Sequence, residues 1–265
     1  FGKQWQADTT KFIEDAGGKV VGSVLHPLNS NDFSSYLLQA QASGAKVIAL
    51  ANSGSDFANV IKQAQEFGIT AAGQKLAPLG VQINQVHGIG LQVAQGLQIV
   101  TPFYWDYNDE TREFAERFRE RFRDRTPNET MAGTYSAVNH YLKAVKSTGT
   151  DDGEAVVKAM HETPVNDFEM KDVTIRADGQ VMRPMYAATI KSPDESKSDY
   201  DYYTITGVVP AAAHFGDFML GLPGAVENTR AALAAGVTTV GNLGQYFTFR
   251  LPDWDDDVAT TEATV

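Results

Sequence analysis

The sequence contains no cysteine, so disulfide bonds and thiolate metal sites are excluded. It also lacks any apolar run of the roughly 20 residues that a membrane-spanning helix needs. Positive charge is scarce, since 22 lysines and arginines stand against 33 aspartates and glutamates, for a formal net charge of −11. Nucleic acid and anionic membranes repel such an excess of acid, so we expect neither as a partner. A hydrophobic content of 43% still suffices for a folded core.

Signatures of common catalytic sites are missing as well. There is no Gly-x-Ser-x-Gly motif, and the segment GGKVVGS lacks the Lys-Ser/Thr ending of a phosphate-binding loop. The five histidines are scattered, with no partner at ligand spacing on a predicted helix. An acidic run at Asp253 and residues 255–257 is more typical of a solvated helix start than of a cation site. We therefore expect no catalysis, no cofactor and no metal.

What the sequence does have, over residues 1–105, is a regular alternation of predicted helices and strands. Helices are predicted at 4–16, 30–44, 56–68 and 86–94, and strands at 19–27, 45–51, 74–81 and 96–105. Such spacing is typical of right-handed β-α-β units. The predicted fold class is α/β, with an open parallel sheet covered by helices on both faces.

Residues 106–209 change character. Three helices are predicted, at 108–127, 131–149 and 152–164, followed by a hairpin over 173–193 and a further strand before residue 210. In the first helix, an i, i+4 stripe of Phe114, Phe118 and Phe122 predicts core packing. In the second helix the predicted inward face consists of Tyr135, Val138, Leu142 and Val145.

The C-terminal stretch, residues 210–265, is rich in glycine and alanine. It predicts a loop, a helix at 224–235, a strand at 237–240 and then a loop with glycine and aromatic residues. This is one more αβ unit, placed after the hairpin that completes the preceding pattern.

A small polar loop at the end of the predicted strand 45–51 is the first candidate site. Asn52, Ser53 and Gly54 follow the strand directly and precede a helix. In open α/β sheets ligands bind at the carboxyl ends of strands, where helix N-termini offer free N–H groups. The alternative is a plain helix cap, for which Ser55 or Asp56 would suffice.

Two further strand ends carry polar or aromatic candidates. The loop at 78–85 holds Gln82, Asn84 and Gln85. Tyr104 stands in an aromatic cluster at 103–107, which could line a ligand cleft. Packing between two lobes explains each of these aromatics equally well.

Several long strings together resemble a known family. They are GGKVVGSVLHPLNSNDFSSYLLQAQASGAKVI, NDETREFAERFRERF, YSAVNHYLKAVKSTGTDDGEAVVKAM and IRADGQVMRPMYAATIKSP. Over residues 1–209 the chain resembles the second lobe and following segments of a type I periplasmic substrate-binding protein of ABC importers, from the branched-chain amino-acid-binding, leucine-binding-like group. Both chain ends look open, so we expect a fragment of a longer protein.

The resemblance implies two Rossmann-like lobes with a small ligand held between them. Residues 1–105 would form the second lobe, and residues 106–209 would return to the first. The implied ligand contacts are Phe1, Asn52, Ser53, Gly54, Gln82 and Tyr104. The resemblance further implies ABC permease membrane subunits as partners and a periplasmic location. Because no acid occupies the loop at 79–82, a carboxylate without an amine fits this pattern better than an α-amino acid does.

The tail points elsewhere. Residues 213–265 resemble part of a cobalamin-dependent mutase of the glutamate mutase large-subunit type, and about 50 residues cannot close such a barrel. A chimeric reading frame, a mutase fragment and a receptor domain that reuses the binding-protein fold are therefore open alternatives.

Overall fold

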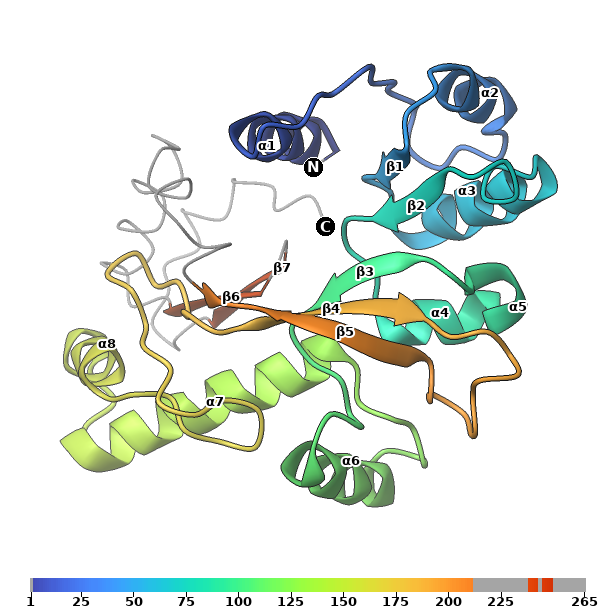
Figure 1. Cartoon of the computed structure of the whole chain (residues 1–265). Coiled ribbons are helices and arrows are strands. Elements are labelled where there is room, and N and C mark those ends of the chain that lie inside the picture. Colours follow the sequence, from blue (N-terminus) through green and yellow to red (C-terminus); the bar gives the residue numbers. More distant parts are fainter. Residues whose placement is uncertain (1, 212–237, 243–244, 250–265) are drawn as a thin grey trace. The chain divides into compact units, whose positions relative to one another are not determined.

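The computed structural model describes residues 2–211, 238–242 and 245–249 (Figure 1). The chain divides into two compact units, the first made of Phe1–Thr101 and Ala187–Gly207, the second of Pro102–Tyr186 and Val208–Val265. The chain crosses from one unit to the other within strand β4 (Met185–Ile190) and again within strand β5 (Tyr203–Val209). None of the described helices has the length and hydropathy of a membrane span.

The first unit is built on a β-α-β element. Its helices and strands are α1 (Gly2–Asp15), α2 (Ser34–Ala42), β1 (Val47–Leu50), α3 (Gly54–Glu66), β2 (Lys75–Pro78), α4 (Ile83–Ile89), α5 (Leu91–Ala94) and β3 (Gln98–Thr101). Strands β1 and β2 are parallel, and α3 connects them. Phe57, Ile61 and Ala64 of α3 are almost fully buried. The predicted α/β class is therefore confirmed, with β1 and β2 forming a two-stranded parallel sheet.

The predicted strand at 19–27 is wrong. These residues have no regular secondary structure, and Val21 and Leu25 are 52% and 56% exposed. An extended segment becomes a strand only when a neighbour supplies its backbone hydrogen bonds. In the described part of the chain β1 pairs with β2 alone, so no strand is bonded to the free edge of β1.

In its described residues the second unit contains the helices α6 (Asp109–Arg121), α7 (Glu129–Thr148) and α8 (Gly153–Glu162). Each begins with a side-chain cap, from Asn108, Asn128 and Asp152 respectively. Phe114 is buried and stacks on Phe168 with ring centroids 3.8 Å apart. The predicted phenylalanine stripe thus packs into the core at its first residue and reaches solvent at Phe122, which is 41% exposed.

The predicted inward face of α7 is wrong for three of its four residues. Tyr135, Val138 and Leu142 are 45%, 36% and 56% exposed, whereas Val145 packs against the core. The buried residues of α7 are mainly small: Ala132, Gly133, Ser136, Ala137 and Ala144, with Glu129 and His140. Small side chains allow close approach, and Ala144 contributes to a cluster with Val156 and Met160 of α8.

The predicted hairpin forms only around its turn. Ile175 and Val181 bridge in antiparallel fashion, and Gly179 has a φ of 87°, which glycine adopts without strain. Strand β4 instead joins a three-stranded sheet in the order β3-β4-β5. The reason is that strand pairing is decided by distant partners as well as by the nearest turn.

In the tail, β6 (Thr238–Asn242) pairs antiparallel with β7 (Gln245–Phe249). The predicted strand at 237–240 is confirmed, and the predicted loop after it is wrong, because part of it is a strand. The predicted helix at 224–235 and the acidic run at 253–257 lie outside the described residues.

Candidate ligand-binding site at the strand ends

The strand-end loop, defined here as residues 51–55, joins β1 to α3, includes the first two residues of that helix, and is the centre of the candidate site. Gly54 has a φ of 58°, a conformation that side chains with a Cβ rarely adopt. A Cβ placed there would have no neighbouring atom within 4 Å. Glycine at position 54 therefore allows the backbone to turn into the helix, and the space beside it is open.

Ser53 occupies the N-cap position of α3, yet no side chain caps this helix. The Ser53 backbone is extended, and within the described residues its hydroxyl has no hydrogen bond. The Asp56 carboxylate accepts from the Asn29 N–H at 3.0 Å instead of from its own helix. Among the described residues the side-chain cap that the alternative requires is therefore not formed, and contact of this loop with a ligand stays a prediction.

Asn52 is 7% exposed, and its amide nitrogen lies 2.7 Å from His26 Nε2. The His26 ring in turn packs edge-on against Phe33, the residue just before α2, with centroids 4.8 Å apart. The sequence analysis did not single out His26, although this residue stands near the end of the predicted strand at 19–27. The candidates named there come from the ends of other predicted strands.

An anchored loop, residues 26–33, carries His26 and is held by the polar face of α3. Asn59 donates to the Ser30 carbonyl at 3.3 Å, and Gln63 donates to the Asn31 carbonyl at 2.9 Å. Gln63 Oε1 also accepts from the Phe33 N–H at 2.7 Å. These bonds satisfy loop backbone groups that no sheet satisfies, and so fix the position of His26 relative to Asn52.

Helix α1 covers the carboxyl end of β2. A Cβ on Gly80 would lie 2.4 Å from Trp5 Cη2, so the indole sits directly on this glycine. At the end of β1, a Cβ on Gly2 would be 3.7 Å from the Ala51 carbonyl oxygen. Trp5 is thus a second residue near the strand ends that the sequence analysis did not single out.

The other predicted contacts have separate positions. Gln82 is the N-cap of α4, and its N–H donates to Gln85 Oε1 at 2.8 Å, as in a capping box. Tyr104 belongs to the second unit, where it is 4% exposed and meets Trp105 edge-on at 6.1 Å. Phe1 lies outside the described residues. The structure therefore brings Asn52, Ser53 and Gly54 together, and their role as ligand contacts stays a prediction.

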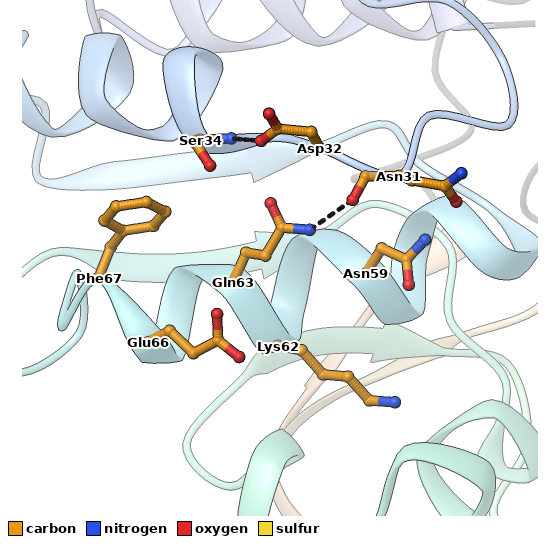
Figure 2. Close-up of a pocket in the computed structure, with 8 residues that line it drawn as sticks. All are labelled: Asn31, Asp32, Ser34, Asn59, Lys62, Gln63, Glu66 and Phe67. Carbon is orange, nitrogen blue, oxygen red and sulfur yellow. Dashed lines mark hydrogen bonds between the residues drawn. The ribbon is translucent and has the colours of Figure 1, made fainter.

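A pocket of about 390 Å³ lies elsewhere on the first unit, between the start of α2 and the outer face of α3 (Figure 2). Its lining is polar and includes Asp32, Lys62, Gln63 and Glu66. Two of its walls are already joined by the hydrogen bond from Gln63 to the Asn31 carbonyl. It contains none of the predicted contacts.

The second unit contains a buried ion pair. Arg183 Nη1 lies 3.0 Å from Glu169 Oε1, with side chains 4% and 2% exposed. Arg183 also donates to the Pro102 carbonyl. Burial raises the pKa of Glu169, against the opposing effect of the Arg183 guanidinium. Within the described residues no group of three or more histidine or acidic side chains is arranged to hold a metal ion.

Comparison with known proteins places this fold in a family. The family model for periplasmic binding proteins matches residues 1–198. A periplasmic binding protein from Burkholderia mallei is 41% identical, with a TM-score of 0.74 over 80% of this chain and 56% of that chain. A branched-chain amino acid ABC transporter periplasmic ligand-binding protein from Burkholderia xenovorans is 38% identical, with a TM-score of 0.71 over 77% and 54%.

More distant structures share the fold. A solute-binding protein of an ABC transporter from R. palustris, solved in complex with benzoate, is 17% identical, with a TM-score of 0.63 over 76% of this chain and 53% of that chain. No match is found among curated proteins. The chain spans little more than half the length of these structural relatives. The family match ends before residue 213, so the mutase resemblance of the tail stays a prediction. Over residues 1–198 the match is decisive, and the chain belongs to the periplasmic binding protein family.

Proposed function

We propose that this chain is the solute-binding component of an ABC importer and that the strand-end loop forms one wall of its ligand site. The observation that carries the proposal is that the helix start at Ser53 and Gly54 has no side-chain cap and lies beside open space. The helix that starts there has 13 residues. The N-terminus of such a helix favours an anionic group, because its first N–H groups point outward and its dipole is positive there.

The proposed ligand is a small carboxylated molecule, with an aromatic or branched aliphatic body. The loop after β2 offers Leu79, Gly80 and Gln82, and none of these can neutralise an ammonium group. A fold relative is solved with benzoate, which supports a carboxylate without an amine. Two lobes would close on the ligand in the periplasm and so capture it. The protein would then deliver the ligand to the permease subunits in the membrane.

A thermal-shift screen of the intact protein against branched-chain and aromatic acids tests this function. A ligand that binds the folded state raises the melting temperature in a concentration-dependent way. We expect at least one small acid to do so. If every acid leaves the melting temperature unchanged, the solute-binding proposal is wrong.

Two substitutions at one position locate the site. Ser53→Trp places an indole in the open space and should abolish the ligand-induced shift while leaving the unliganded melting temperature within a few degrees of wild type. Ser53→Ala is the matched control, because it removes the hydroxyl without filling the space. A full ligand response in Ser53→Trp would mean that the ligand binds elsewhere.

A further inference from the structure

The contacts of His26 determine which of its nitrogens carries the proton. His26 Nδ1 lies 2.8 Å from the Pro27 carbonyl oxygen, which can only accept a hydrogen bond. Nδ1 must therefore be the donor. In the neutral imidazole Nε2 then has a lone pair, and it accepts from the Asn52 amide N–H at 2.7 Å.

This tautomer in turn fixes the orientation of the Asn52 amide. Turning the amide over would place its oxygen against the Nε2 lone pair, and two acceptors repel each other. The amide nitrogen is therefore held at His26, and Oδ1 occupies the other side of the group. Within the described residues no donor is bonded to this oxygen.

We propose that His26 is a positioning residue that makes Asn52 a hydrogen-bond acceptor toward the ligand. The ligand class that follows is a small acid that also carries a donor, such as a hydroxyl group or an amide N–H. This inference rests on the proposed function, because it takes Asn52 to be a wall of the ligand site. Asn52 then selects the donor, and the start of α3 receives the carboxylate.

A nuclear magnetic resonance experiment tests the arrangement without a ligand. Long-range ¹H–¹⁵N spectra of the protein at about pH 8 distinguish the two neutral histidine tautomers, since only the protonated nitrogen has the shift of an N–H group. We expect His26 to carry its proton on Nδ1. A proton on Nε2 would overturn the inference, because Asn52 would then present NH₂ and not oxygen to the site.

Binding measurements test the predicted preference for an acid that carries a hydrogen-bond donor, which is the ligand half of the inference. The probes are two pairs: benzoate with 4-hydroxybenzoate, and 4-methylpentanoate with 2-hydroxy-4-methylpentanoate. We expect a hydroxylated acid to bind about tenfold more tightly than its partner, the effect of one well-made hydrogen bond in a buried site. His26→Phe keeps a ring against Phe33 but lacks the acceptor, so the preference should disappear. His26→Gln offers an amide oxygen to Asn52 and should restore it.

Rescue by the conservative variant separates positioning from a structural role, because the His26→Gln amide restores the preference only if an acceptor for the Asn52 amide is what matters. A preference that persists in His26→Phe, or that is absent in the wild type, overturns the inference. Should no acid bind at all, the proposed function and the ligand half fail together, and the tautomer alone decides whether His26 orients Asn52.

Discussion

Helices α3 and α7 are both amphipathic, and they bury opposite kinds of side chain. Helix α3 buries Phe57, Val60 and Ile61 and turns a polar face to the anchored loop. Helix α7 buries mostly alanine, glycine and serine and leaves Tyr135 and Leu142 exposed. Hydrophobic periodicity therefore located both helices, but the face that it predicted as buried in α7 is mostly exposed.

The difference arises from what each helix packs against. An α-helix that lies on a parallel sheet inserts large side chains between its neighbours. A helix that lies close to another helix needs small residues at the contact, as α7 does beside α8. When large residues occupy one stripe and small residues another, the sequence alone does not say which stripe the fold covers.

The largest expected effect comes from removing the main anchor of α3. Phe57→Ala should lower the free energy of unfolding by about 3–5 kcal/mol, because Phe57 is 1% exposed and its loss leaves a cavity. Urea unfolding followed by circular dichroism measures the change. A loss below about 1 kcal/mol would show that α3 is not the central packing element of the first unit.

Next in size is an enlargement of the small face of α7. Ala132 is 0% exposed and packs beside Phe103 and Phe114, so Ala132→Leu should cost about 1–3 kcal/mol through overpacking. The same urea experiment applies. An Ala132→Leu protein as stable as wild type would mean that this face has unfilled space.

A smaller effect is expected on the polar face of α3. Asp56 is 4% exposed, and its Oδ2 accepts from the Asn29 N–H while, in the described chain, its Oδ1 has no partner. Asp56→Ala should cost about 1–2 kcal/mol, because the loop N–H loses its acceptor. Faster amide hydrogen exchange at Asn29 should accompany the loss. Asp56→Asn keeps an acceptor and is the control, and equal exchange in both variants would contradict this assignment.

The smallest effect belongs to the exposed stripe of α7. Leu142 is 56% exposed, so Leu142→Ala should change the free energy of unfolding by no more than about 0.5 kcal/mol. A decrease of 2 kcal/mol or more in the free energy of unfolding would mean that Leu142 is buried, as the sequence predicted.

The parts of the fold that follow from local rules were predictable. Capping asparagines and aspartates, glycine stops and the continuous apolar run of β1 are signals within a few residues of the element they define. The strand at 19–27 and the second half of the hairpin depend on partners far away in the sequence, and there the predictions failed. In the site, the strand-end position of Asn52 was visible from the sequence. Its bond to His26 was not, because 26 residues separate the two and the geometry of the anchored loop brings them together.

The central claim is that the strand-end loop, and not the pocket beside α2, receives the ligand. A ¹H–¹⁵N correlation titration with the acid that gives the largest thermal shift tests it directly. The account predicts that the backbone amides of Ser53, Gly54 and Ser55 shift most and saturate with the binding curve, while those of Asn31, Gln63 and Phe67 stay in place. Saturating shifts confined to the second group, with the strand-end loop unchanged, would contradict it.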